Sequence, residues 1–229
     1  MITIDSLTVR YGSLTALDGL TMHLPERAVH GLVGVNGAGK TSLFNALYGF
    51  VTPAGGSVTR SGHPLRRREM AYLESENLFY DGMTGRDMLD LTVRYHPTSD
   101  PAPYVRIFAL PVDRPVAEWS TGMRKKLALT VTLMQRKPVL LLDEPFNGLD
   151  MESLYAAQQL ILQRRAEGAT ILVSSHLFST LEALCDDIRL LDGGRITAEY
   201  RRGEYRRAAG ELEEMFHRHY LTHFNGKIS

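Results

Sequence analysis

The sequence predicts an α/β fold with a mainly parallel sheet, and three observations carry this prediction. Residues 29–33 are mostly apolar, like a buried strand, and lead through a glycine-rich loop into residues spaced along one helix face. Residues 139–142 form a fully apolar run, which is typical of a second buried strand. From residue 139 to residue 198, strand and helix patterns alternate, and such alternation favours parallel strands.

The remaining elements can be predicted in chain order. Residues 1–30 alternate apolar and polar side chains, which indicates paired strands with a turn near residues 11–13. The helix after the glycine-rich loop ends at Gly49, and a short strand is expected at residues 57–60. Residues 82–137 are mainly helical with proline punctuation, and we interpret them as a helical lobe inserted into the α/β unit. The later elements are a helix at 151–166 stopped by Gly168, a strand at 170–173, a helix at 177–184, and strands at 188–191 and 195–198.

The glycine-rich loop carries the strongest functional signal. It reads Gly34-Val35-Asn36-Gly37-Ala38-Gly39-Lys40-Thr41, a complete P-loop of the form G-x-x-x-x-G-K-[ST], and Ser42 follows in the predicted helix. Its glycines let the backbone N–H groups wrap around a polyphosphate, and the helix N-terminus adds a positive dipole end. Lys40 would reach the β- and γ-phosphates, and the Thr41 hydroxyl would ligate magnesium. The strand–loop–helix setting makes a chance match a poor explanation, so we expect a nucleoside triphosphate to bind here.

A pair of carboxylates follows the second apolar strand. The run Leu140-Leu141-Leu142 ends in Asp143 and Glu144. In P-loop ATPases an acidic residue at this strand end holds the magnesium ion, and Asp143 fits that role. Glu144 is then the candidate general base or water-orienting group for attack on the γ-phosphate. The pair alone is a weak signal, but together with an upstream P-loop it predicts hydrolysis.

The composition excludes several other classes of protein. The 229 residues carry 26 basic and 26 acidic side chains, so net charge gives no attraction to nucleic acid or anionic lipid. The single cysteine, Cys185, excludes an internal disulfide. No apolar run approaches the roughly 18 to 20 residues of a membrane helix, and the first residues do not read as an export signal. We therefore expect a cytoplasmic chain that reaches a membrane only through a partner.

Four further motifs occur in a specific order along the chain. Ser120-Thr121-Gly122-Met123-Arg124 opens a helix with Ser120 as its N-cap, which in isolation would be an ordinary capped helix. Asn147-Gly148-Leu149-Asp150 follows the acidic pair, His176 follows the next strand, and Tyr11 lies near the start of the chain. With the P-loop and the acidic pair, this order and spacing resemble those of the ATP-binding-cassette (ABC) proteins from Met1 to about Ala198.

The resemblance implies an ATPase in which two copies sandwich two ATP molecules. Ser120, Gly122 and Met123 would be the signature residues that contact the partner's ATP, and Asp150 would belong to the D-loop. His176 would be the switch histidine that senses the γ-phosphate, and Tyr11 would stack on the adenine. The implied fold is a P-loop NTPase core with an antiparallel β lobe and a helical lobe. We expect a nucleotide-binding domain over residues 1–200, with its helical lobe at 82–137, and a C-terminal helical extension over 201–229.

The sequence departs from the family pattern at two motifs. The signature has Thr121 in place of a glycine and Met123 in place of glutamine, as in many bacterial export ATPases. Ser75 stands where the family has the Q-loop glutamine, which contacts magnesium and the attacking water. Ser75 remains a candidate magnesium ligand, but its side chain is shorter, and Glu74 or Glu76 are alternatives. The tail around residues 211–216 resembles the short helix that ends many export ATPases.

The leading hypothesis is the ATPase subunit of an ABC transporter, an exporter by its subgroup resemblance. Its expected partners are a separate transmembrane permease subunit and a second ABC ATPase subunit, in a homodimer or heterodimer. Its expected cofactors are ATP and a magnesium ion, and its expected place is the cytoplasmic face of the cell membrane. The alternatives are an ABC ATPase that acts on nucleic acid or the ribosome, and a weakly hydrolysing nucleotide sensor. No nucleic acid is expected. Family members that act on chromosomes carry a long coiled-coil insertion and those that act in translation carry two cassettes in one chain, whereas this chain has one cassette and no room for such an insertion.

Overall fold

The computed structural model describes residues 1–207 and 209–211. The chain divides into two compact units. The first unit contains residues 1–25 and 29–65 and the described residues from 174 onward, and the second contains residues 26–28 and 66–173. The P-loop and His176 belong to the first unit, whereas the acidic pair, the signature helix and Ser75 belong to the second.

The first unit contains the antiparallel sheet that the family resemblance implies. Its strands are β1 (Ile2–Tyr11), β2 (Leu14–Leu24), β4 (Gly55–Arg60) and β5 (His63–Pro64), in the order β2-β1-β4-β5. Ile4 pairs with Met22 on one side and with Val58 on the other. Alternate residues of β1, such as Ile2 and Ile4, are fully buried, which is the pattern of a sheet with one covered face.

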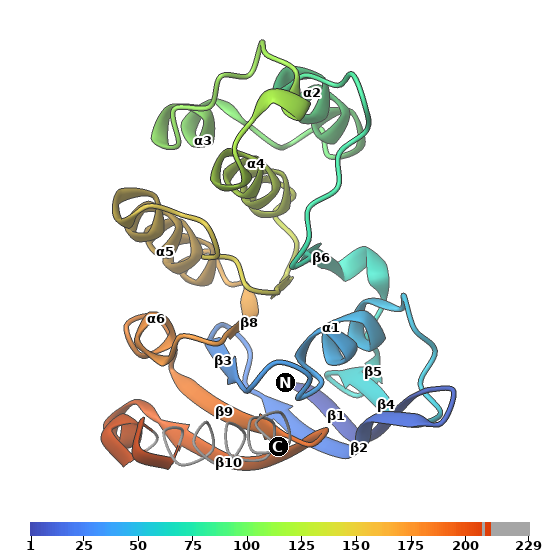
Figure 1. Cartoon of the computed structure of the whole chain (residues 1–229). Coiled ribbons are helices and arrows are strands. Elements are labelled where there is room, and N and C mark those ends of the chain that lie inside the picture. Colours follow the sequence, from blue (N-terminus) through green and yellow to red (C-terminus); the bar gives the residue numbers. More distant parts are fainter. Residues whose placement is uncertain (208, 212–229) are drawn as a thin grey trace, which may run out of the picture. The chain divides into compact units, whose positions relative to one another are not determined.

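The P-loop joins a strand and a helix in another part of the first unit. Strand β3 (Val29–Val33) runs parallel to β9 (Asp187–Asp192), which pairs with the antiparallel β10 (Arg195–Arg201). Helix α1 (Lys40–Tyr48) follows the loop and packs on β1 and β2 (Figure 1). Helix α6 (Phe178–Glu182) and a 3-10 turn at Arg202–Glu204 follow, and residues 205–207 and 209–211 are helical. The order β3–loop–α1 is therefore the strand–loop–helix that the sequence predicts.

The second unit combines parallel strands with four helices. Strands β6 (Met70–Leu73), β7 (Val139–Leu142) and β8 (Thr170–Ser175, of which 170–173 belong here) are parallel, with Leu142 opposite both Leu73 and Val173. The helices are α2 (Gly85–Tyr95), α3 (Ala102–Ile107), α4 (Thr121–Met134) and α5 (Met151–Ala166). Helix α4 packs against α2, α5 and β6 (Figure 1). All four residues of β7 are buried, as expected for a strand covered on both faces.

Most predicted elements are confirmed, and the differences lie at their ends. The strand at 139–142 and the helix at 151–166 have the predicted bounds, and α1 ends at the predicted Gly49 cap. The predicted helix at 177–184 is shorter, at 178–182, whereas β8, β9 and β10 are longer than predicted. Helix α6 begins one residue later because Leu177 is an extended N-cap without a side-chain hydrogen bond. Of the predicted tail helix, residues 212–216 lie outside the described residues.

Within the described residues, no helix combines the length and the apolar character needed to cross a membrane.

Candidate ATP-binding and hydrolysis site

The P-loop adopts a conformation that depends on its glycines. Gly37 and Gly39 have φ angles of 85° and 110°, in the left-handed region that side chains disfavour. A Cβ atom at Gly39 would also lie 2.7 Å from the carbonyl oxygen of Ala16. At Gly34 a Cβ atom would lie 2.4 Å from the carbonyl oxygen of Leu191. The loop is therefore held in a shape that larger residues at these positions would disrupt.

The N-terminus of α1 has features that favour anion binding. No side chain caps this helix end, and its first turn contains no acidic residue. The backbone N–H groups and the helix dipole are thus not opposed by a local carboxylate. Lys40 is only 7% exposed, and its Nζ donates to the carbonyl oxygens of Gly34 at 2.7 Å and Val35 at 3.2 Å. The lysine therefore spans the loop, and the loop has the donors and the charge that a polyphosphate requires.

Neighbouring turns of the first unit support the P-loop. The N–H of Gly194, in the β9–β10 turn, donates to the carbonyl of Ala38 at 3.1 Å, and its own carbonyl accepts from the N–H of Asp18 at 3.2 Å. A Cβ atom at Gly194 would come within 2.7 Å of the carbonyl oxygen of Ala16. Tyr11 ends β1 opposite Leu14 and is 44% exposed. An exposed ring on a hairpin of the same unit is suited to stacking on a base.

His176 follows β8 in the first unit and is exposed. The hydroxyl of Ser175 accepts a hydrogen bond from the N–H of Leu177 at 3.0 Å and lies 3.1 Å from the hydroxyl of Thr180. These bonds fix the backbone on either side of His176 and leave the imidazole at the surface. The structure thus places the predicted switch histidine on a short, hydrogen-bonded turn.

The acidic pair lies at the end of β7 in the second unit. Asp143 is fully buried, and its backbone N–H donates to the carbonyl of Leu73 at 2.9 Å. Glu144 is 9% exposed and has a φ angle of 48°, which is unusual for a residue with a side chain. Such a conformation costs about 1 to 3 kcal/mol and persists only where the surrounding structure holds it. The N–H of Asn147 donates to the carbonyl of Glu144 at 3.4 Å, which closes the turn.

The signature helix and the D-loop meet in the second unit. Ser120 is exposed and caps α4 by accepting from the N–H of Met123 at 3.2 Å. A Cβ atom at Gly122 would lie 2.4 Å from the carbonyl oxygen of Gly148, so the two motifs touch through their backbones. The Nζ of Lys126 lies 3.1 Å from Oδ2 of Asp150, whose Oδ1 caps α5 by accepting from the N–H of Ser153 at 2.8 Å. The hydrogen bonds from Ser153, and then Lys126, hold the pKa of Asp150 well below its usual range.

Ser75 is half-buried in the segment that follows β6. This segment borders a groove of about 150 Å³. The groove is lined by Tyr72, Leu73, Glu74, Glu76, Asn77, Leu78, Phe79, Met88, Ala128, Val131 and Thr132. Leu78 is 92% exposed, and Tyr80 is also exposed. Leu78 and Tyr80 are therefore at the surface, and Glu74 and Glu76 line the same groove.

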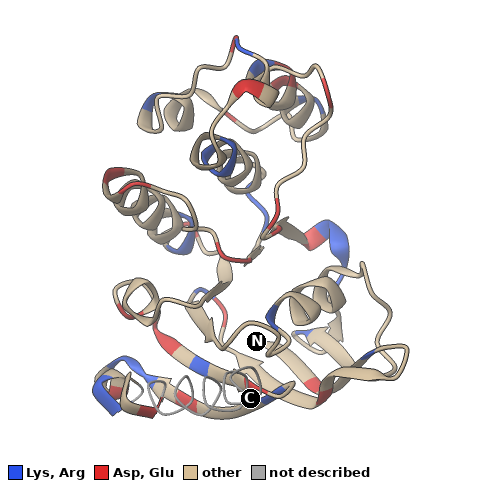
Figure 2. Cartoon of the chain, viewed as in Figure 1, with Lys and Arg blue, Asp and Glu red and all other residues tan. Residues whose placement is uncertain are grey.

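Lys125 is a residue of this site that the sequence analysis missed. It is buried within α4, and its Nζ donates to the carbonyl oxygens of Ser75 at 2.8 Å and Glu74 at 3.4 Å. Burial lowers the pKa of this ammonium, and the charges of Asp143 and Glu144 oppose that change. Figure 2 shows basic residues on α4 and acidic residues at the carboxyl ends of the neighbouring strands. In the sequence, Lys125 is the middle residue of the basic run 124–126, and this run carries no signal that one of its side chains is buried.

The predicted magnesium ligands have suitable chemistry. The hydroxyl of Thr41 and the carboxylate of Asp143 offer hard oxygen donors, which Mg²⁺ prefers together with phosphate oxygens and water. The described residues contain no group of three or more His, Cys, Asp or Glu side chains that could hold a metal ion alone.

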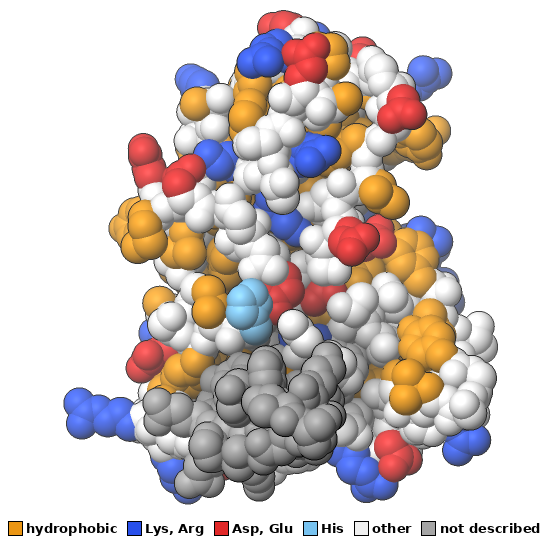
Figure 3. All heavy atoms as spheres, viewed as in Figure 1, with side chains coloured by type: hydrophobic (Ala, Val, Ile, Leu, Met, Phe, Trp, Pro, Cys, Tyr) orange, Lys and Arg blue, Asp and Glu red, His pale blue; other side chains and the backbone are white. Residues whose placement is uncertain are grey.

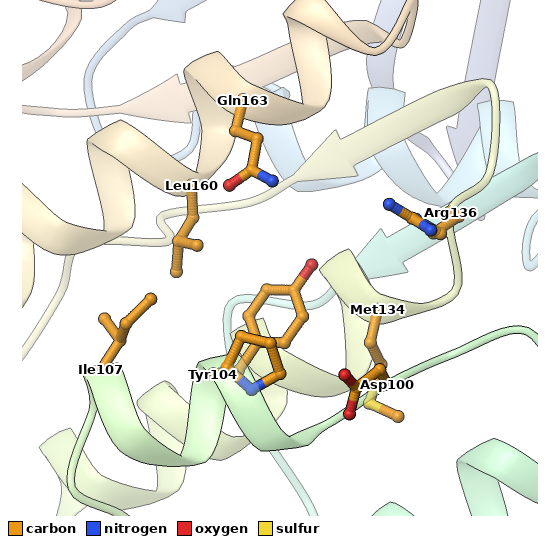
Figure 4. Close-up of a pocket in the computed structure, with 8 residues that line it drawn as sticks. Asp100, Tyr104, Ile107, Met134, Arg136, Leu160 and Gln163 are labelled. Carbon is orange, nitrogen blue, oxygen red and sulfur yellow. The ribbon is translucent and has the colours of Figure 1, made fainter.

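A separate cavity of about 200 Å³ lies in the second unit among α3, α4 and α5 (Figure 4). Tyr104 projects toward its centre, with Ile107 and Leu160 on one side and Met134 on the other. None of the predicted site residues lines this cavity. Burial raises the pKa of Tyr104 above its ordinary value.

Comparison with known proteins identifies the relatives of this chain. The family described as "ABC transporter" matches residues 17–147. The lantibiotic transport ATP-binding protein SrtF of Streptococcus pyogenes is 32% identical, over 96% of this chain and 98% of its own. The Nod factor export ATP-binding protein I of Paraburkholderia xenovorans is 32% identical, over 86% of this chain and 70% of its own. The solved structure of an ATP-binding subunit of an ABC transporter is 27% identical, with a TM-score of 0.84 over 94% of this chain and 98% of its own.

Proposed function

This chain belongs to the ABC transporter family, and we propose that it is an ATPase subunit that drives export through a separate membrane-spanning permease. ATP binding and hydrolysis are the activities of the family. The observation that most supports them here is the P-loop, whose uncapped helix end and buried Lys40 match the needs of a polyphosphate.

The residues divide the chemistry of hydrolysis between them. The P-loop N–H groups and Lys40 hold the β- and γ-phosphates, while Thr41 and Asp143 supply ligands for magnesium. Magnesium, when bound, neutralises the charge that develops on the phosphates. Glu144 accepts a proton from the attacking water, and His176 contacts the γ-phosphate from its exposed turn. Tyr11 stacks on the adenine.

The working unit is a pair of ATPase subunits. Ser120 and the N–H of Gly122 face the ATP of the partner subunit, together with Met123. Support comes from the exposed position of Ser120 at the N-terminus of α4 and from the Gly122–Gly148 contact, which ties the signature to the D-loop. Either a homodimer or a heterodimer fits these residues.

The groove beside Ser75 is the proposed docking place for the permease. The exposed side chains of Leu78 and Tyr80 offer apolar contact area, and Glu74 and Glu76 add negative charge. Docking there would hold the chain at the cytoplasmic face of the membrane. Export is favoured over import because the relatives include a protein named for lantibiotic transport and one named for Nod factor export.

Two other functions remain as alternatives. For an ATPase that acts on nucleic acid or the ribosome, a basic surface would be needed. On the face shown in Figure 3, acidic and basic side chains are interspersed, which gives no broad positive patch there. A weakly hydrolysing nucleotide sensor would fit the loss of the Q-loop glutamine at Ser75.

Co-purification separates the three functions. A tagged chain isolated from detergent-solubilised membranes of its host should retain a protein with several membrane spans. Leu78→Arg should release that protein while ATP binding persists, because Leu78 lies in the groove. Tyr155→Arg, at an exposed position on α5, is the matched control and should retain it. Recovery of RNA or ribosomes, or of no partner at all, would contradict the transporter function.

A further inference from the structure

Lys125 is buried in α4 although its side chain is charged. The hydrogen bonds of its Nζ go to two backbone carbonyls, those of Glu74 and Ser75. A buried charge costs several kcal/mol unless it is well compensated. A methionine or leucine would fill the same space at a lower cost, so packing does not explain a lysine at this position.

The two carbonyls belong to the segment that replaces the Q-loop. Glu74 and Ser75 directly follow Leu73, the last residue of β6. The carbonyl of Leu73 accepts from the N–H of Asp143, and Leu73 lies opposite Leu142 in the parallel pair β6–β7. One short path therefore runs from the ammonium of Lys125, through the backbone after β6, to the two carboxylates at the end of β7.

We propose that Lys125 is a positioning residue for ATP hydrolysis: its ammonium holds the backbone of Glu74 and Ser75 against α4 and thereby fixes this segment relative to Asp143 and Glu144. The bonds go to backbone carbonyls, so they do not require a glutamine side chain at position 75. The lysine thus supplies a link between the signature helix and the segment after β6 that does not depend on the side chain at position 75.

The same link lies beside the proposed docking groove. Glu74 and Ala128 both line the groove, and Ala128 lies about one helical turn after Lys125 on α4. A partner segment in the groove would touch both elements that Lys125 joins. This point rests on the proposed function: the permease would then act on hydrolysis by moving the segment after β6 against α4.

The test compares three variants of the full-length chain. Lys125→Met keeps the length and removes the donors, Lys125→Arg restores a cation with donors, and Arg94→Met removes an exposed cation from α2. We expect Lys125→Met to lower kcat about tenfold to a hundredfold while the ATP dissociation constant stays within about twofold, since small misplacements act on turnover. Lys125→Arg should recover most of the turnover, and Arg94→Met should match the wild type.

Amide hydrogen exchange provides a readout that does not depend on turnover. In Lys125→Met, the amides of residues 75–80 should exchange faster, because their segment has lost its link to α4. If Lys125→Met does not fold, Lys125→Gln serves in its place with the same two measurements. The proposal would be overturned if Lys125→Met, or Lys125→Gln in its place, kept the wild-type kcat and the wild-type exchange rates. It would also be overturned if Lys125→Arg and Lys125→Met lost kcat to the same extent. A wild-type chain with no ATPase activity would instead contradict the proposed function, and the exchange data would still test the link.

Discussion

The imidazole of His30 lies with Nδ1 2.9 Å from the carboxylate of Asp187, and both side chains are buried in the first unit. The two residues are partners in the parallel pair β3–β9. Nε2 of His30 lies 2.8 Å from the carbonyl oxygen of Pro25, so both ring nitrogens face acceptors. Arg189, also buried, contacts the same carboxylate and reaches Glu199 at 2.7 Å. This network anchors the strand that leads into the P-loop.

The network predicts a specific dependence of stability on pH. Burial raises the pKa of Asp187, but the hydrogen bond and charge of His30, with Arg189, outweigh this and bring the pKa below its ordinary value. A carboxyl group whose pKa is lower in the folded than in the unfolded chain stabilises the fold at pH values above its unfolded-state pKa. That stability is lost as the pH falls through the folded-state pKa. Acid unfolding of the wild type should therefore gain a contribution from Asp187 only below about pH 4.

Replacement of His30 should move this transition. His30→Gln removes the partner of a buried charge and should lower the free energy of unfolding at pH 7 by about 3 kcal/mol. The folded pKa of Asp187 should rise, so that acid destabilisation begins at a higher pH. Urea titrations at several pH values measure both effects. His63→Gln, at an exposed position on β5, is the control, and equal behaviour of the two variants would contradict the role of the network.

Glu144→Gln should separate ATP binding from hydrolysis. The amide keeps the size of the side chain but cannot accept the proton of the attacking water, so turnover should fall at least about a hundredfold. ATP should remain bound and hold two chains together, visible as a dimer in size-exclusion chromatography. Glu118→Gln, at an exposed position in the same unit, should leave turnover unchanged. Normal turnover in Glu144→Gln would remove Glu144 from the role of base.

Ser120→Arg should block ATP-driven dimerisation and leave the ATP affinity of the single chain nearly unchanged. The exposed serine is proposed to face the partner's nucleotide, so a large side chain there acts on assembly. The variant also loses the N-cap of α4, worth about 1 kcal/mol. Ser120→Asp separates the two effects, because aspartate can cap the helix but repels phosphate. Loss of monomeric ATP affinity in a binding titration would contradict the sandwich arrangement.

Ser75→Gln should raise the basal kcat of the isolated chain with little change in the ATP dissociation constant. The longer side chain would reach the metal and the attacking water, and the carbonyl bond to Lys125 would remain because it involves the backbone. Ser75→Ala is the matched control and should give no increase. An unchanged or lower kcat in Ser75→Gln would mean that Glu74 or Glu76 already fills the role, or that coupling uses another residue.

The sequence by itself determined the local structure of the site. The P-loop could be predicted because its shape depends on glycines within a few residues of Lys40, and the helix at 151–166 because its start and stop signals lie at its own ends. The strand at 139–142 and the acidic pair that follows it could likewise be predicted from neighbouring residues alone. The helix at 177–184 was predicted too long, since its boundaries depend on how the turn after β8 is held.

Only the tertiary structure decided which distant residues meet. The link from Lys125 to Ser75 joins positions 50 residues apart, and the pair His30–Asp187 joins positions 157 residues apart. The contact of Gly122 with Gly148 likewise depends on how the signature helix packs beside the turn after β7. Spacing along one chain carries no information on such pairs, because they are fixed by strand order and helix packing. The burial of Lys125 against two backbone carbonyls is one such feature, which its place in the run 124–126 does not show.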